Sequence, residues 1–301
     1  MWFPPTRLAR ECSRDGDGAL TEAAAATGLS EVKTMVSTGG EYYLGLDIGS
    51  LSTKCVVIDA EREIVQTHVT ATGCSPGRTG RAVYDDLLAR AGIRDGLRGV
   101  VATGYGRVSI DFASKRFTEI ACHARGAHHH NPGVRTVVDI GGQDSKVIKL
   151  NEGGDVIDFC MNDKCAAGTG KFLEIMAKTL TVDLVELGPV AAASRAPCAL
   201  SSTCSVFAES EVVSLLAEGA SREDILAGVC RSVARRVGNM AVRMGLDGDV
   251  VFVGGVSKNV GVRRELQEFL GIEFFELPGD PQLNGALGAA LLAKEADHGN
   301  Q

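Results

Sequence analysis

The chain has 301 residues, of which 45% are apolar and 23% charged, a composition typical of a folded globular protein. Its net charge of −7 does not favour nucleic-acid binding, and no apolar run approaches the roughly 20 residues that span a bilayer. The N-terminus lacks the apolar segment of a signal peptide, so we expect a cytoplasmic protein with neither a membrane nor a nucleic acid as partner.

Residues 1–40 differ from the rest in their alanine, glycine and proline clusters, and we expect a poorly ordered tail there. From residue 42 the apolar pattern becomes regular. The first part is predicted to hold strands at 42–48, 53–58 and 64–70, a helix at 79–91, a strand ending at 103–104 and a helix at 119–128. The second part is predicted to hold strands at 134–140, 145–150 and 156–161, helices at 171–180, 206–216 and 222–244, a strand at 250–253, a helix from 259, a strand at 273–277 and a helix at 283–293.

Two successive units of three strands indicate an internal duplication, because each carries Asp-Ile-Gly at its first turn. The pattern predicts a mixed α/β fold with two related lobes and a ligand cleft between them. We place the first lobe at 41–134 and the second at 135–282. The helix and tail at 283–301 are expected to pack back on the first lobe.

Both turns have the features of phosphate-binding loops. Glycine lets the backbone approach a phosphate and donate from its N–H groups, and Mg²⁺ prefers carboxylate, water and phosphate oxygens. Asp47 and Asp139, which end the preceding strands, are therefore assigned to the Mg²⁺ environment. The predicted loop residues are Gly49, Ser50, Leu51, Ser52, Thr53 and Lys54 in the first unit and Gly141, Gly142, Gln143 and Asp144 in the second.

A third glycine motif follows the apolar strand at 250–253. Gly254 and Gly255 can seat a ribose and an α-phosphate against the backbone, and Asn259 begins the next helix. The three motifs, in this order and spacing, resemble the actin/Hsp70/sugar-kinase superfamily. The resemblance implies a duplicated actin-like ATPase fold of ribonuclease-H-like lobes that close on ATP.

Two cysteine segments narrow the resemblance: Met161-Asn162-Asp163-Lys164-Cys165-Ala166-Ala167-Gly168-Thr169-Gly170 and Ser201-Ser202-Thr203-Cys204-Ser205-Val206-Phe207-Ala208-Glu209-Ser210-Glu211. With Thr103-Gly104-Tyr105-Gly106-Arg107 and the Gly-Gly-Gln-Asp loop, they resemble the activator ATPases of 2-hydroxyacyl-CoA dehydratases. The ATPase subunits of benzoyl-CoA reductase belong to the same family and are the alternative. The loop and the Asn-Asp-Lys-Cys segment look more like the dehydratase activators.

The resemblance implies one 4Fe–4S cluster per homodimer, held by Cys165 and Cys204 of each chain. Such a cluster normally takes four thiolates, which a two-fold dimer of this chain would supply. It also implies that ferredoxin or flavodoxin donates one electron, which ATP hydrolysis helps to pass to a dehydratase-type component. By analogy with phosphoryl-transfer sites, Gln143 and Asp144 are the candidates to position or polarise the attacking water.

Two other functions remain open on the same fold. A small-molecule kinase would need a substrate-binding insertion, for which a core of this length has little room. A nucleotide-dependent redox sensor would bind nucleotide without productive hydrolysis, and the Gln143-Asp144 pair argues against it.

Further features have plainer interpretations. His128 to His130 are predicted to be a solvated helix end, because adjacent side chains cannot all face one ion. Arg231, Arg235 and Arg236 are predicted to form a solvated helix face, and Glu209 and Glu211 are candidates for the nucleotide cleft. Cys160 is predicted to be a core residue and Cys198 an accidental ligand or redox liability, whereas Cys12, Cys55, Cys74, Cys122 and Cys230 are predicted to be structural.

Overall fold

The computed structural model describes residues 40–93, 95–201 and 204–298. The chain divides into two units, Met1–Thr34 and Met35–Gln301, and all described residues belong to the second. The predicted N-terminal tail lies outside the described residues, apart from Gly40. No described helix has the length and apolarity to cross a bilayer.

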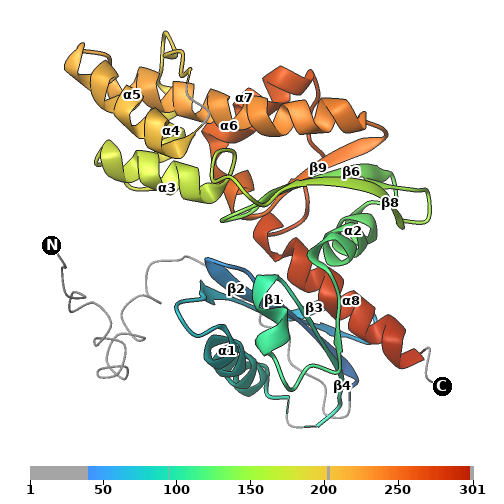
Figure 1. The fold of residues 1–301 in the computed structure, drawn as a ribbon. Helices are drawn as coiled ribbons and strands as arrows, with labels where there is room; N and C mark the ends of the chain where they lie inside the picture. The colour runs from blue at the N-terminus through green and yellow to red at the C-terminus, as the bar shows by residue number, and fades with distance from the viewer. Residues whose placement is uncertain (1–39, 94, 202–203, 299–301) are drawn as a thin grey trace, which may run out of the picture. The chain divides into compact units, whose positions relative to one another are not determined.

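Two mixed sheets share the order and direction of four strands, and the first sheet has β5 in addition (Figure 1). The first has the order β3-β2-β1-β4-β5, built from β1 (Tyr42–Ile48), β2 (Ser52–Asp59), β3 (Ile64–Ala71), β4 (Leu97–Thr103) and β5 (Lys115–Arg116). The second has the order β8-β7-β6-β9, built from β6 (Val134–Ile140), β7 (Ser145–Leu150), β8 (Val156–Asn162) and β9 (Asp249–Val253). In each sheet an antiparallel hairpin leads and the fourth strand pairs in parallel with the first. The duplicated α/β architecture predicted from the sequence is therefore confirmed.

Helices cover both faces of each sheet. On the first sheet, α1 (Pro76–Ala91) shares a buried apolar cluster with one face and α8 (Asn284–His298) with the other. On the second sheet, α2 (Glu119–His130) covers one face, and α6 (Arg222–Met244) covers the other. Burial of these apolar faces stabilises each lobe.

The helices α2 and α8 pack side by side and so connect the two sheets (Figure 1). Glycine makes the close crossing possible: a Cβ on Gly288 would overlap the Cys122 carbonyl, and one on Gly126 would overlap the carbonyl of Asn284. The backbone of α8 also lies directly on β1, where a Cβ on Gly45 would overlap Ala286.

The remaining α-helices belong to the second half of the chain and are α3 (Gly170–Thr179), α4 (Leu187–Ala192), α5 (Ser205–Ala217) and α7 (Val260–Leu270). The described 3₁₀ turns include η4 (Tyr105–Ser109) in the first half and η5 (Gly255–Lys258) and η6 (Pro281–Leu283) in the second. The predicted strand at 273–277 is wrong, because only Phe275 pairs there, in an isolated bridge to Val251. The helix α4 and the 3₁₀ turns were not predicted; they are too short for periodicity to show them.

Candidate functional site

The two predicted phosphate loops form equivalent hairpin turns. The Gly49 N–H donates to the Ser52 carbonyl at 3.1 Å, and the Gly141 N–H donates to the Asp144 carbonyl at 2.9 Å. The loops also approach each other, because a Cβ on Gly142 would lie 2.7 Å from the Leu51 side chain. The fold thus brings together two turns that are about 90 residues apart in sequence.

Each loop is preceded by a buried acid paired with a lysine on the next strand. Asp47 lies opposite Lys54, with Oδ2 3.0 Å from Nζ, and Asp139 lies opposite Lys146, with the corresponding atoms 3.2 Å apart. The spacing is the same in both units, so the sequence already contained the signal for Lys146, which the motif analysis missed. Lys54, which is predicted to contact phosphate, is paired with Asp47 in this structure.

Lys146 is the centre of a buried charged cluster. Its ammonium lies 2.8 Å from Glu119 and 2.7 Å from Asp144 as well as close to Asp139, while its side chain is only 3% exposed. Burial alone would lower the pKa of Lys146, but Asp139, Glu119 and Asp144 outweigh it and raise that pKa. The ammonium therefore remains charged across the neutral range.

The acids of this cluster respond differently. Burial raises the pKa of Glu119 despite the nearby Lys146. Burial acts in the same direction on Asp139, but the charges of His123, whose Nε2 lies 3.6 Å away, and of Lys146 lower the pKa overall. Asp139 is thus held as a carboxylate at neutral pH.

Three carboxylates of this cluster supply oxygen donors of the kind that a hard divalent cation takes, and the Lys146 ammonium lies among them in this structure. Oxygens of Glu119, Asp139 and Asp144 all lie within 4.8 Å of one another, and carboxylate oxygen is the protein ligand that Mg²⁺ prefers. Glu119 reaches this place from α2, so no local sequence motif marked it. Asp47 lies near the same region, because Asp47 and His123 both flank Gly285. A Cβ built on Gly285 would lie 3.3 Å from Asp47 and 3.1 Å from His123.

The third glycine motif packs directly on the second acid. Gly254, the residue before η5, has φ of +86°, and a Cβ there would overlap Asp139 and the Ile140 carbonyl. Gly104, the residue before η4, has φ of +89°, and a Cβ there would overlap Asp47 and the Ile48 carbonyl. Only glycine suits this combination of positive φ and close approach. The duplication therefore extends to the fourth strand of each sheet.

Several predicted nucleotide ligands have other partners. Thr53 is fully buried and its hydroxyl pairs with Thr72 at 3.0 Å, so we omit it from the site. The Asn259 side chain accepts from the N–H groups of Gly261 and Val262, which makes it the N-cap of α7. Ser52 accepts from Gln282, a residue that the sequence analysis did not identify, at 3.1 Å.

Three further residues that were predicted for the nucleotide site, Ser50, Gln143 and Gly255, lie at or beside the glycine turns. Gln143 is exposed and donates no side-chain hydrogen bond within the described part of the chain. Ser50 is partly buried. There is open space beside Gly255, because a Cβ built there would lie 3.8 Å from the nearest atom outside its chain neighbours, in Gln282. Among the described residues, Glu209 accepts from Thr179 and Glu211 accepts from Ser201, and neither bond involves a phosphate loop.

The segment with Cys165 is joined to the second phosphate loop. The side-chain amide of Asn162 donates to the carbonyls of Cys165 and Ala167 at 2.9 and 3.1 Å, which fixes the loop between β8 and α3. At the start of α3, the N–H groups of Gly170 and Lys171 donate to the carbonyls of Gly141 and Gly142 at 2.9 and 2.8 Å. A movement of that phosphate loop therefore acts directly on the helix that follows Cys165.

Cys204 is the exposed N-cap residue of α5, whereas Cys165 lies five residues before α3 and is partly buried. The two helices pack together, and Thr179 donates to Glu209 at 3.3 Å between them. The two cysteines therefore differ in their position relative to the helix that follows each of them. The positive end of a helix dipole, which would stabilise a thiolate, lies at Cys204 only.

The other cysteines are mostly structural. Cys55, Cys122 and Cys230 are buried, and burial raises the pKa of each thiol. Cys74 is exposed, so it does not have the predicted packing role, and Cys12 lies outside the described residues. The histidines at 128–130 end α2 as predicted, with His129 exposed and the other two partly buried.

The paired sheets, the three glycine turns and the acids between them define an actin-like ATPase fold. Residues 44–293 match the model of the BadF/BadG/BcrA/BcrD ATPase family, and the chain belongs to that family. The resemblance drawn from the sequence motifs is confirmed.

Relatives with known roles are similar over most of their length. The chain is 47% identical to the 2-hydroxyisocaproyl-CoA dehydratase activator of Clostridioides difficile over 84% of this chain and 94% of that protein. It is also 47% identical to the (R)-2-hydroxyglutaryl-CoA dehydratase activating ATPase of Acidaminococcus fermentans, over 84% and 96%. A subunit of the benzoyl-CoA reductase of Thauera aromatica is 31% identical, over 82% of this chain and 91% of that protein.

A solved structure shows the same fold with a nucleotide analogue. The activator of the 2-hydroxyisocaproyl-CoA dehydratase from Clostridium difficile, with bound ADPNP, superposes with a TM-score of 0.81 at 45% identity. The match covers 86% of this chain and 97% of that one.

Proposed function

We propose that this protein is an ATP-dependent one-electron activator of a 2-hydroxyacyl-CoA dehydratase-type enzyme. The observation that carries the proposal is the pair of hydrogen bonds from the start of α3 to Gly141 and Gly142, because they join a phosphate loop to the segment that contains Cys165. The higher identity to dehydratase activators, against 31% to the benzoyl-CoA reductase protein, supports the dehydratase partner.

ATP is proposed to bind with its phosphates between the turns at 49–52 and 141–144 and its nucleoside against Gly254 and Gly255. Backbone N–H groups of the glycine turns would donate to the phosphate oxygens. Asp139, Asp144, Glu119 and Asp47 would hold Mg²⁺ directly or through water, and the ion would neutralise charge on the phosphates. Gln143, exposed at the turn, is proposed to orient the attacking water.

Cys165 and Cys204 are proposed to hold one 4Fe–4S cluster between the two chains of a homodimer. The residues fit such a group: both thiols are at least partly accessible, and Cys204 lies at the N-terminus of α5. The group would supply a store for one low-potential electron, received from ferredoxin or flavodoxin.

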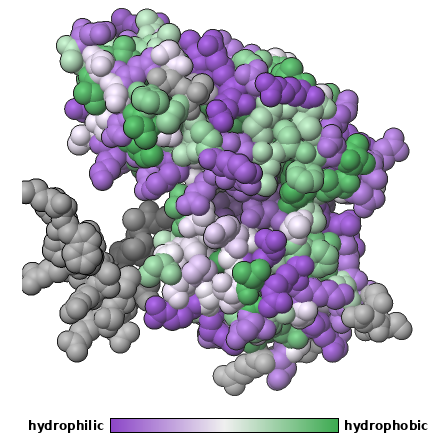
Figure 2. Space-filling model, viewed as in Figure 1, coloured by the Kyte–Doolittle hydropathy of each residue, from purple (hydrophilic) through white to green (hydrophobic). Residues whose placement is uncertain are grey.

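The dimer contact is proposed to include α5. Val206, Phe207 and Val213 on this helix are 67%, 67% and 53% exposed. Three large apolar side chains exposed on one helix mark an interaction surface. Figure 2 shows hydrophobic surface over the region where Figure 1 draws α5. A second copy of the chain would cover these side chains and bring Cys204 of each chain to a common axis.

Nucleotide can drive electron delivery only by binding two arrangements of the protein with different affinity. Closure of the second phosphate loop on ATP would pull α3 through the Gly170 and Lys171 hydrogen bonds. Because α3 packs on α5, the change would alter the geometry around both cysteines. A small-molecule kinase has no use for this connection, whereas a nucleotide-dependent redox sensor would share it and is separated from an activator by electron delivery coupled to ATP turnover.

The proposal is tested by adding the anaerobically purified protein, ATP, Mg²⁺ and a low-potential reductant to an inactive 2-hydroxyacyl-CoA dehydratase component. Activation that needs hydrolysable ATP and is lost in Cys165→Ser, but retained in Cys74→Ser, is expected. Activation of a benzoyl-CoA reductase component alone would instead support the alternative partner. ATP turnover with activation of neither component would exclude the activator role.

A further inference from the structure

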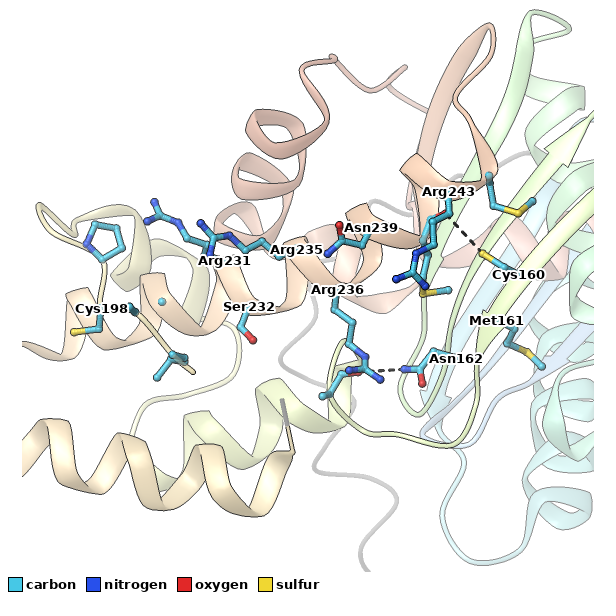
Figure 3. Close-up of a pocket in the computed structure, with 17 residues that line it drawn as sticks. Cys160, Met161, Asn162, Cys198, Arg231, Ser232, Arg235, Arg236, Asn239 and Arg243 are labelled. Carbon is cyan, nitrogen blue, oxygen red and sulfur yellow. Dashed lines mark hydrogen bonds between the residues drawn. The ribbon is translucent and has the colours of Figure 1, made fainter. Parts of the chain in front are cut away.

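A cavity of about 710 Å³ lies outside the nucleotide site, between α6, the edge strand β8 and the segment 197–200 (Figure 3). Its volume falls within the roughly 300–1,000 Å³ of small-molecule sites. Arg231, Arg235 and Arg236 line it, so the face of α6 that we predicted to be merely solvated is one wall of a cavity.

The positive charge in this cavity is largely unpaired. Arg231 is paired with Glu265, at 2.8 Å. Within the described part of the chain, Arg235, Arg236 and Arg243 have no carboxylate within 4.0 Å. In Figure 3 the side chains of Arg236 and Arg243 extend from α6 toward β8, where Asn162 lies beside Arg236. A protein of net charge −7 thus concentrates free guanidinium groups at one place.

The rest of the lining is apolar. Leu200, Met240 and Met244 are partly buried side chains that pack against the core of the second lobe and line the cavity. Cys160 and Cys198 contribute thiols at the same level of burial. Cys160 packs against the core of the second lobe, in agreement with its predicted core role, and also lines the cavity.

We propose that this cavity binds a phosphate-bearing small molecule that also has an apolar part. The guanidinium fork matches phosphate oxygens and forms strong charge-assisted hydrogen bonds, which explains Arg236 and Arg243. The methionine and leucine side chains suit the apolar part of the ligand. A plain inorganic anion would leave this apolar lining unused.

The cavity is connected to both cysteine segments. The Arg236 side chain packs on Gly168, where a Cβ would lie 2.9 Å from its Cδ, and Ala167 lines the cavity two residues after Cys165. Cys198 lines the opposite side, six residues before Cys204. An occupant would therefore restrict both segments, giving the protein an input separate from the nucleotide site.

The test is calorimetric titration of the anaerobically purified protein with acetyl-CoA, which has phosphates and an apolar chain, and with pyrophosphate, which has phosphates alone. Saturating ADP keeps the nucleotide site filled. Acetyl-CoA is expected to bind at one molecule per chain and more tightly than pyrophosphate. The double variant Arg236→Gln/Arg243→Gln should weaken binding about tenfold or more, and Arg222→Gln, an exposed change at the start of α6, should not.

A second measurement does not depend on the double variant folding. Acetyl-CoA should slow maleimide labelling of Cys160 and Cys198 in the wild-type protein without affecting the exposed Cys74 in the other lobe. Absence of acetyl-CoA binding, equal binding by the double variant, or unchanged labelling of both cavity cysteines would overturn the proposal. Binding of pyrophosphate alone would also overturn it. None of these readouts uses electron transfer, so they are independent of the proposed function.

Discussion

Replacement of Lys146 by methionine tests the buried charged cluster beside the second phosphate loop. Lys146 lies within 3.2 Å of three carboxylates and is 3% exposed, so its loss leaves buried negative charges without a counter-ion. Removing one partner of a buried ion pair costs about 3–5 kcal/mol, and we expect a loss of this size in the free energy of unfolding at pH 7.5. The similar shape of methionine keeps the packing change small.

The loss should depend on pH in a defined direction. In the wild type the pKa of Lys146 is raised and that of Asp139 is lowered, so their contributions are both present from about pH 5 to pH 9. Without the ammonium, the pKa values of Asp139 and Glu119 rise, and the folded state binds more protons than the unfolded state. The variant should therefore regain stability as the pH falls from 7.5 to 5.5, by at most about 1.4 kcal/mol per pH unit for each proton.

Urea unfolding at pH 7.5 and 5.5 measures both effects. Lys149→Met is the matched control on the same strand, because Lys149 pairs with Asp247, whose side chain is 64% exposed. Lys149 is 16% exposed and also donates to the Met244 carbonyl, but its one carboxylate partner is open to solvent, so the control should lose only about 1–2 kcal/mol. Equal losses in the two variants, or a Lys146→Met deficit that does not change with pH, would refute this account of the cluster.

Three further changes test the loops. Gln143→Ala should lower the ATPase rate about a hundredfold and leave nucleotide affinity within a few-fold; a lost affinity would contradict its assignment to the attacking water. Gly254→Ala should lower the free energy of unfolding in urea by about 2–4 kcal/mol, because the new Cβ would overlap Asp139. The control Gly271→Ala has φ of +67° but open space around the Cβ, and it should lose about 1 kcal/mol. Similar losses in the two variants would refute the close approach of Gly254 to Asp139. Asn259→Ala should cost about 1 kcal/mol through loss of the α7 cap, and an unchanged melting midpoint would argue against that role.

Local sequence patterns predicted most of the fold because its elements are long and periodic. The strand at 42–48 and the helix at 222–244 were predicted with the bounds that the structure shows. The predicted strand at 273–277 failed because a short apolar segment does not by itself supply a pairing partner, and only Phe275 finds one.

The site was less predictable where it depends on residues from different elements. Glu119 and His123 come from α2 and reach Asp139 only after the helix packs on the second sheet. Thr53 illustrates the opposite error, because its place in the motif suggested a phosphate contact while the strand turns its hydroxyl to Thr72. The Lys146 pairing was available from the repeated seven-residue spacing, which shows that duplication is best searched beyond the motif itself.

The most direct test of the proposed activator is the iron and acid-labile sulfide content of the anaerobically purified protein, measured together with its mass in solution. The account predicts a dimer with about two irons and two sulfides per chain, as one shared 4Fe–4S cluster requires, and their loss in Cys165→Ser and Cys204→Ser. An iron-free monomer that still hydrolyses ATP, under conditions that support cluster assembly, would contradict it.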